Sequence, residues 1–367
     1  MKILTTSLKI GKYEIKFPIV QGGMGIGVSW DQLAGSVSRE GGLGVLSAIG
    51  TGYYKELKFA KKVINGRPFD TENLYSFEAL QEIVKSAREI CKNRPLGVNI
   101  MCAINDYARV VVDACKSGID IIISGAGLPT NLPEITKDFP HVALVPIVSS
   151  AKALKIICKR WVQRYNRVPD AVIVEGPLSG GHQGFTYEQC TMQEYQLENL
   201  IKPIKDEIRE WGDFPLIAAG GIWDNEDINK MLELGADGVQ MGTRFIGTHE
   251  CDAHEVFKNV LLNAKREDIE LLKSPVGYPA RGVRTKLINL VDKREGPKIK
   301  CVSNCVTPCH RGVEAKAVGY CIADRLYDAY SGREESGLFF TGQNGYKLDE
   351  IISVKELMQK LVNGEGK

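Results

Sequence analysis

Short runs of apolar, β-branched residues alternate along the chain with longer segments in which apolar residues recur every three or four positions. The short runs predict buried strands, and the longer segments predict amphipathic helices. Helices are expected, for example, at 30–40, 151–165 and 224–234. This alternation predicts a parallel sheet with right-handed crossovers. Eight candidate strands occupy residues 17–21, 43–48, 96–100, 120–127, 142–148, 170–174, 215–219 and 238–241.

Glycine clusters follow many of these strands rather than a single one. In an open doubly wound sheet, which is the alternative, the ligand loops gather at one switch point. The pattern therefore favours an α/β fold of the (β/α)8 TIM barrel type, with its site at the carboxyl ends of the strands. We expect the barrel in residues 1–290, with a mostly helical insertion at about 52–93 that breaks near 66–68. A cysteine-containing C-terminal extension, residues 291–367, is expected to pack on the barrel.

A loop with the sequence EGPLSGGHQG, residues 175–184, follows the candidate strand at 170–174. Its glycines let a flat or charged ligand approach the main chain closely. Its histidine, His182, can exchange protons near neutral pH. The alternative is a surface loop with a hydrogen-bonded histidine, and the residues of this loop alone do not decide between the two.

Two more glycine turns end the last two candidate strands. Gly220 and Gly221 follow residues 215–219, and Gly242 and Thr243 follow residues 238–241. In barrels of this kind, the loops after strands seven and eight often bind phosphate through backbone N–H groups. The pattern predicts a phosphate site here, with the Thr243 hydroxyl as a further donor. Two tight turns without a ligand are the alternative.

Composition and charge exclude several classes of protein. The chain has 367 residues, of which 44% are hydrophobic and 25% charged, and its net charge is +2. No strong electrostatic field argues for nucleic acid or a membrane surface as a partner. No segment is typical of a signal peptide or reaches the roughly 18 apolar residues of a membrane span. With ten cysteines, a cytoplasmic protein with reduced thiols is expected.

The C-terminal extension carries four of the cysteines. Four thiolates could bind zinc or an iron–sulfur cluster. However, Pro308 opposes a single helix through the first three, and C-x2-C pairs are absent. We therefore predict structural cysteines and no metal site. Before the extension, Arg281 and Arg284 could hold an anionic group or form structural salt bridges. The four cysteines are Cys301, Cys305, Cys309 and Cys321.

Five motifs in order resemble the nitronate monooxygenase (2-nitropropane dioxygenase-like) family, which includes the flavin-dependent enoyl-[acyl-carrier-protein] reductases. An ordered set of motifs is far more specific than any one of them. A later segment, residues 274–285, is also similar to the family. The resemblance implies a barrel that holds FMN without a covalent bond. The motifs are QGGMG at 21–25, LGVN at 96–99, SGGH at 179–182, AAGGI at 218–222 and QMGTRF at 240–245.

The resemblance also implies a role for each matching residue. His182 would remove a proton next to a nitro group or, in a reductase, orient the substrate or cofactor, and an ordinary pKa of about 6.5 would suit such a base. The protein supplies position and dipoles, and the flavin carries the redox chemistry. The flavin ring would contact Gly22, Gly23, Met24 and Asn99, the ring and ribityl chain would pass over Gly180 and Gly181, and the phosphate would be held by Gly220, Gly221, Gln240, Met241, Gly242 and Thr243.

The function implied first is oxidation of alkyl nitronates with O2 to a carbonyl compound and nitrite. An NAD(P)H-dependent enoyl reductase is the alternative, followed by an FMN-binding redox sensor. A nucleotide dehydrogenase of the inosine monophosphate type is disfavoured, because no cysteine lies in a recognisable loop of that kind. One departure from the family is Lys202 or Pro203, where many members carry a glutamine. The expected partner is a small nitronate or enoyl thioester, and a homodimer is one option.

Overall fold

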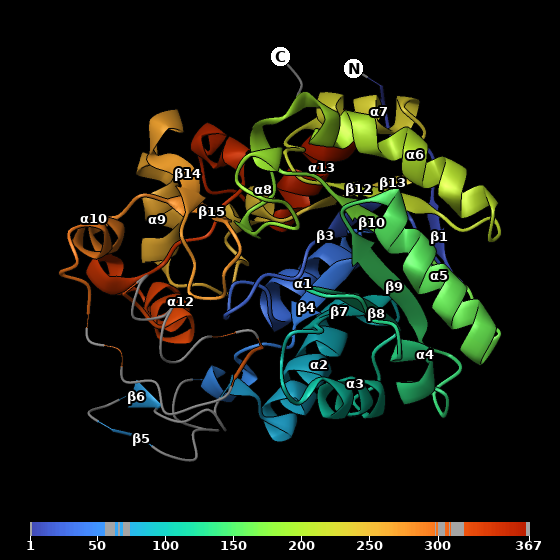
Figure 1. Cartoon of the computed structure of the whole chain (residues 1–367), viewed down its shortest axis with the longest axis horizontal. Coiled ribbons are helices and arrows are strands. Elements are labelled where there is room, and N and C mark those ends of the chain that lie inside the picture. The colour runs from blue at the N-terminus through green and yellow to red at the C-terminus, as the bar shows by residue number, and fades with distance from the viewer. Residues whose placement is uncertain are drawn as a thin grey trace.

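The computed structural model describes residues 2–55, 74–297, 299, 305–307, 309 and 319–364, and the backbone alone at 63–64 and 67–68. Eight parallel strands form a barrel with helices packed around it (Figure 1). This confirms the predicted (β/α)8 TIM barrel over the open doubly wound sheet. In order around the barrel, the strands are β3 (Ile19–Gln21), β13 (Gly238–Met241), β12 (Leu216–Ala219), β10 (Val172–Glu175), β9 (Ala143–Val148), β8 (Ile121–Gly125), β7 (Leu96–Met101) and β4 (Gly44–Ser47).

The barrel closes between its first two strands, β3 and β4. Gln21 N donates to Leu43 O at 2.8 Å, and Leu43 N donates to Ile19 O at 2.9 Å. The buried Gln21 side chain also bridges the seam, because its Oε1 accepts from Val45 N at 3.1 Å. The sheet therefore has no free edge at this point, and all eight carboxyl ends point to one rim.

An N-terminal hairpin closes the opposite rim of the barrel. It consists of β1 (Leu8–Ile10) and β2 (Tyr13–Ile15). Leu8, Ile10 and Ile15 are almost fully buried and share one hydrophobic cluster with the side chains inside the barrel. Tyr13 Oη donates to His141 O, just before β9, at 2.8 Å. Since the hairpin fills the amino-terminal end, only the carboxyl end remains for a ligand. The sequence analysis did not predict this hairpin.

The helices agree closely with those expected from the hydrophobic pattern. Each barrel helix turns its apolar face towards the strands, and the expected helices at 30–40, 151–165 and 224–234 are confirmed to within a residue or two. The helices are α1 (Asp31–Arg39), α2 (Phe77–Cys91), α3 (Tyr107–Lys116), α4 (Leu132–Ile135), α5 (Ala151–Tyr165), α6 (Leu197–Arg209), α7 (Asn225–Glu233), α8 (Thr243–Ile246), α9 (Glu255–Asn263), α10 (Lys286–Asp292), α12 (Ile322–Tyr330) and α13 (Val354–Asn363).

The insertion at 52–93 contains one long helix and a pair of short strands in the part that the structure describes. A 3₁₀ turn at Thr51–Tyr53 comes first, and α2 is the helix. Between them, β5 (Val63–Ile64) pairs antiparallel with β6 (Arg67–Pro68). These strands flank an Asn-Gly pair, the sequence typical of a two-residue hairpin turn. The expected break near 66–68 falls at this strand pair, and the expectation of a mostly helical insertion stays a prediction where the segment lies outside the described residues.

A second, antiparallel sheet lies beside the barrel. Its strands, in order, are β11 (Gly181–His182), β15 (Ala280–Val283) and β14 (Ile269–Leu272). His182 pairs with Ala280 in this sheet, and Phe340 of the C-terminal extension bridges to Gly282. The pairing fixes the histidine loop against two later parts of the chain. Elsewhere, α13 of the extension packs against α1 and α7.

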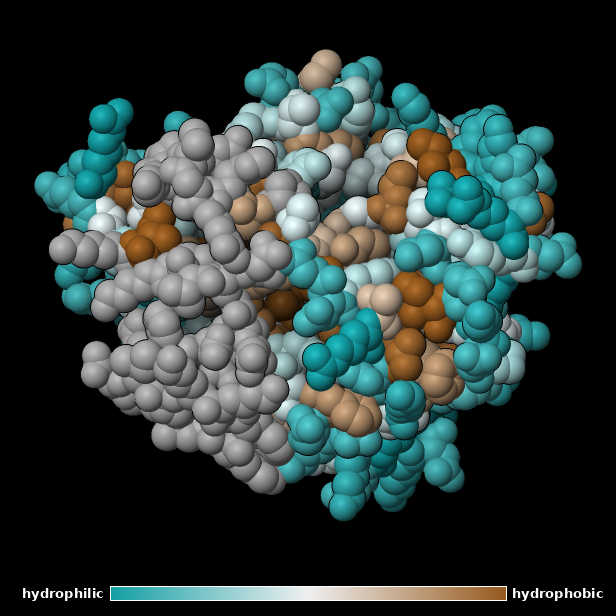
Figure 2. All heavy atoms as spheres, turned by 60° about the horizontal axis from the view of Figure 1, so that its bottom comes forward, coloured by the Kyte–Doolittle hydropathy of each residue, from teal (hydrophilic) through white to brown (hydrophobic). Residues whose placement is uncertain are grey.

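The surface is largely hydrophilic on the face shown in Figure 2, with apolar patches and a central hollow. The exposed large apolar side chains come from scattered positions in the chain, including Ile3, Ile156 and Leu234. None of the helices in the described residues has the length and apolar character needed to cross a membrane. The homodimer stays a prediction.

A distant carboxylate holds the N-terminus of α1. Trp30, the residue before the helix, offers no side-chain cap. Instead Asp252 accepts from Trp30 N at 2.7 Å, Gln32 N at 3.1 Å and Leu33 N at 3.2 Å. These donors have no partner within the helix, so the carboxylate satisfies groups that burial would otherwise leave unpaired.

We expect Asp252→Ala to lower the free energy of unfolding by about 2–3 kcal/mol, because three backbone donors lose their acceptor. Urea unfolding followed by circular dichroism measures the loss. Asp213→Ala, at an exposed aspartate, is the matched control and should change stability by less than about 0.5 kcal/mol. Equal losses in the two variants would contradict the capping role.

Candidate functional site

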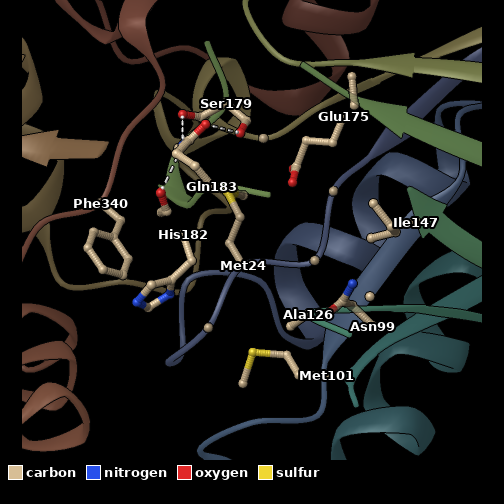
Figure 3. A pocket seen from close by; sticks show the side chains of 18 of the residues that line it. Met24, Asn99, Met101, Ala126, Ile147, Glu175, Ser179, His182, Gln183 and Phe340 are labelled. Atoms are coloured by element: carbon tan, nitrogen blue, oxygen red, sulfur yellow. Dashed lines mark hydrogen bonds between the residues drawn. The ribbon is translucent and has the colours of Figure 1, made fainter. Parts of the chain in front are cut away.

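A cavity of about 740 Å³ opens at the carboxyl ends of the barrel strands (Figure 3). Its position is the one expected for the active site of a (β/α)8 barrel. All the residues that the sequence analysis selected line this one cavity, although they come from five separate parts of the chain. They are Gly22, Gly23, Met24, Asn99, Gly180, Gly181, His182, Gly220, Gly221, Gln240, Met241, Gly242 and Thr243.

Two of these glycines are required by close approaches around the rim. A Cβ atom on Gly23 would lie 2.4 Å from Asn99 Cβ and 3.2 Å from Leu46 O. Gly220 has φ +101°, and a Cβ atom there would lie 2.8 Å from Gly176 O. Side chains at these positions would push neighbouring loops apart. The glycines therefore bring the ends of different strands together as well as exposing main chain to the cavity.

The C-terminal extension crosses the two turns predicted for phosphate. Gly342 N donates to Thr243 Oγ1 at 2.8 Å, and Asn344 Nδ2 donates to Gly221 O at 2.6 Å. A Cβ atom on Gly180 would lie 2.7 Å from the carbonyl carbon of Thr341. Gly180 thus allows the extension to dock, in addition to any role towards a ligand. The sequence analysis placed the extension on the barrel but did not predict that it completes the cavity.

A second part of the extension, residues 305–307, forms another section of the cavity wall. Val306 makes an antiparallel bridge with Ile104, in the loop after β7. Thr307 N donates to Ala103 O at 2.8 Å, and the Thr307 hydroxyl donates to Asn105 Oδ1 at 2.7 Å. Ile322, Ala323 and Leu326 of α12 continue this wall. The extension therefore supplies much of the apolar surface of the cavity.

The cysteines of the extension are placed differently from one another. Cys305 lines the cavity, while Cys309 and Cys321 are half-buried outside the lining. Cys301 lies outside the described residues. Within the described ranges, no group of three or more histidine, cysteine or acidic side chains could hold a metal ion. The absence of a metal site stays a prediction.

His182 stands at the wall of the cavity in a mostly apolar setting. Its Nε2 lies 2.8 Å from Ser274 Oγ, and its ring meets Phe340 edge-on with the ring centroids 5.4 Å apart. Burial lowers the pKa of the imidazole to about 4. The expectation of a pKa near 6.5 was therefore wrong, because desolvation penalises the cation. At neutral pH the ring is therefore uncharged, and burial also makes it a weaker base than a free imidazole.

Ser274 is a site residue to which the sequence analysis gave no role. It belongs to the segment between β14 and β15, which the antiparallel sheet brings beside His182. Its hydroxyl orients the imidazole. The resemblance at 274–285 was the available signal, but only the pairing of β11 with β15 shows that this segment reaches the histidine.

Other candidates have structural roles or lie away from the cavity. Arg281 is buried and donates to Pro177 O at 2.9 Å and to Gln343 Oε1, so it braces the histidine loop against the extension. Arg284 pairs with Glu270 and Asp292. Both arginines thus make structural contacts, which was the alternative to holding an anionic group. On α6, Lys202 pairs with Asp206, and neither Lys202 nor Pro203 lines the cavity.

Charge in the cavity is sparse. Apart from His182, Glu175 at the end of β10 is the one described lining residue with an acidic or basic side chain. Neither lysine nor arginine appears in the described lining. Gln240 presents a buried Oε1 that has no hydrogen-bond partner within the described structure. An unpaired buried amide oxygen is costly, so it marks a place where a ligand group would be accommodated.

The fold and the site define a barrel protein with a glycine-lined ligand cavity at the carboxyl rim. The family model for nitronate monooxygenase matches residues 6–364, and the chain belongs to this family of oxidoreductases. A probable nitronate monooxygenase from Staphylococcus saprophyticus is 24% identical over 77% of this chain and 80% of its own length.

Two solved structures are similar over nearly the whole chain. FabK from Thermotoga maritima is 25% identical, with a TM-score of 0.71 over 95% of this chain and 93% of its own. Nitroalkane oxidase from Streptomyces ansochromogenes is 20% identical, with a TM-score of 0.65 over 94% of this chain and 95% of its own. The second likeness concerns the fold alone.

Proposed function

We propose that the protein is an FMN-dependent oxidoreductase that oxidises alkyl nitronates with O2 to a carbonyl compound and nitrite. The observation that carries the proposal is the convergence of the predicted flavin-binding residues on one cavity in a chain of the nitronate monooxygenase family. The cavity has the size of a site for a drug-sized ligand, typically about 300–1,000 Å³.

The residues present fit FMN in two respects. The turns at Gly220–Gly221 and Gly242–Thr243 line the cavity at the ends of β12 and β13, where backbone N–H groups suit a phosphate. Since the described lining holds no lysine or arginine, these amides and the Thr243 hydroxyl would carry the phosphate. The unpaired Gln240 Oε1 and the Asn99 amide offer hydrogen bonds to the polar edge of the ring.

The chain's own residues then divide the remaining work. FMN, when bound, supplies the two-electron chemistry. His182, neutral and held by Ser274, accepts the proton from the carbon next to a nitro group when the neutral nitroalkane enters. The apolar walls contributed by α12 and residues 305–307 exclude water and suit an alkyl chain. A preformed nitronate has already lost this proton and does not need the base.

A second candidate is an NAD(P)H-dependent enoyl-[acyl-carrier-protein] reductase. The observation that favours it is the similarity to FabK, an enoyl-acyl-carrier-protein reductase, over nearly the whole chain. The apolar cavity would also admit an acyl chain. In that reaction His182 would orient the thioester or the cofactor rather than abstract a proton.

Anaerobic reduction of the purified protein separates the two candidates. We expect the yellow flavin absorbance to bleach on addition of an alkyl nitronate and to persist on addition of NADH alone. NADPH is tested in parallel as the second nicotinamide. Fast bleaching by either nicotinamide, followed by recovery of the colour with a crotonyl thioester, would overturn the preference and support the reductase.

A further inference from the structure

Glu175 is an acidic side chain in a position where the reaction described above does not use it. It is the last residue of β10 and pairs in the barrel with Ala219 of β12. In Figure 3 its carboxyl group points into the cavity, on the opposite side of Met24 from His182. Ionising a carboxyl group in such a place is costly unless a hydrogen-bond donor or an opposite charge lies beside it.

Glu175 has no hydrogen-bond or ion-pair partner within the part of the chain that the structure describes. β9 and β12, the strands on either side, carry no ionisable side chain. On α6, which packs on β10, the charged groups pair at the surface with one another or with neighbouring elements. These pairs are Lys202–Asp206, Lys205–Asp237, Arg209–Asp206 and Glu198–Lys230.

The other titratable groups that line the cavity leave Glu175 uncompensated. They are His182, Tyr278 and Cys305. His182 is uncharged at neutral pH, and the described lining holds no lysine or arginine. Burial alone raises the pKa of Glu175 to about 7. The carboxyl group can therefore change its protonation state near neutral pH, and a nearby change in charge shifts that balance.

We propose that Glu175 takes up a proton when the cofactor in this cavity is reduced, so that its carboxyl group couples the reduction potential of the site to pH. The inference rests on the proposed FMN-dependent function. Reduction of the cofactor takes two electrons and one proton, which NAD(P)H delivers together as hydride; with a nitronate or dithionite as the electron donor, this proton comes from water. A second proton comes from water and ends on a carboxyl oxygen of Glu175.

The electrostatic reason is the absence of any cation in the described lining. Reduction adds negative charge to the cavity. Apart from His182, Glu175 is the one described lining residue with an acidic or basic side chain that could take up a proton in response. Two negative charges close together in a poorly solvated cavity repel strongly, and protonation removes one of them. In the protonated form Glu175 could also donate a hydrogen bond to an acceptor atom of the flavin. Glu175 is thus a positioning and charge-balancing residue, and His182 remains the base.

The test is the pH dependence of the midpoint potential of the FMN-loaded protein, measured by dithionite titration from pH 7 to 9. One additional proton per two electrons makes the potential fall more steeply by about 30 mV per pH unit. We expect this extra slope in the wild type and its loss in Glu175→Gln, which keeps the shape but cannot titrate. Glu194→Gln, at an exposed glutamate, is the matched control and should keep the wild-type slope.

A measurement on the wild type alone covers the case of a Glu175→Gln variant that fails to fold. The infrared difference spectrum between oxidised and reduced protein, at pH 8, should gain a protonated carboxyl band that shifts when glutamate is labelled with ¹³C. Equal slopes in wild type and Glu175→Gln, or a spectrum with no labelled carboxyl band, overturn the inference while the flavin function stands. A protein that binds no FMN overturns the proposed function, and the inference falls with it.

Discussion

His182→Ala should lower the rate with a neutral nitroalkane by about 10²–10⁴-fold, the usual contribution of a positioned general base. The imidazole is uncharged, faces the cavity and is held by Ser274 at 2.8 Å, so it is ready to accept a proton. The rate with a preformed nitronate should fall by less than tenfold, because that substrate needs no base. Steady-state oxygen consumption with the two substrates measures both effects.

The contrast between the two substrates is the decisive part of this result. His141→Ala, at an exposed histidine, is the matched control and should leave both rates unchanged. Equal losses with nitroalkane and nitronate in His182→Ala would show that the ring shapes the pocket and does not act as a base. The rate of Ser274→Ala with the neutral nitroalkane should lie between those of the wild type and His182→Ala, because the imidazole remains but loses its orienting partner.

The pH dependence of the same variant tests the electrostatics of the site. Since burial lowers the pKa of His182 to about 4, the cation forms only below that value. The ratio of the wild-type rate to the His182→Ala rate should stay constant from pH 8 to pH 5 and fall as the pH approaches 4. An inflection of this ratio near 6.5 would mean that water reaches the ring freely.

Gly220→Ala should weaken FMN binding by at least 100-fold. Gly220 has φ +101°, where a side chain is strained, and its new Cβ would lie 2.8 Å from Gly176 O and 3.2 Å from Ser179 N. To relieve both contacts, the turn after β12 must move away from the histidine loop, and the amides proposed to hold the phosphate move with it. Fluorescence titration of the apoprotein with FMN measures the loss.

Gly235→Ala separates strain from site geometry. Gly235 has φ +107°, close to that of Gly220, but a Cβ atom there would meet nothing within 4 Å, and the residue is exposed. This control should lose stability in urea unfolding and yet bind FMN as the wild type does. If both variants bound FMN equally well, the turn at Gly220 would have no part in holding the cofactor.

Much of the fold could be predicted from the sequence because the barrel strands are continuous apolar runs, many of which end in glycines. Each of the eight runs forms a strand, and helices such as α5 begin and end where the apolar period does. The candidate residues share one cavity for the same reason: parallel strands bring all their carboxyl ends to one rim. Local pattern was enough for this part of the site.

The rest of the site depends on contacts between segments far apart in the chain, which no local pattern encodes. Ser274 follows His182 by 92 residues in the sequence and reaches it only through the pairing of β11 with β15. Asn344 reaches Gly221 only because the extension folds back across the rim. The pKa of His182 and the charge balance at Glu175 likewise depend on burial, which follows from the assembled cavity.

The turn at 341–344 has a consequence for how the protein would acquire its cofactor. These residues are synthesised after the last barrel strand, β13, and they hold the two turns proposed to bind the phosphate. A nascent chain would therefore complete its barrel before the turn at 341–344 is in place. The phosphate end of the cavity would then be accessible from outside. Once this turn has docked, it would have to detach before FMN could leave. The cofactor should therefore stay bound during dialysis and dilution.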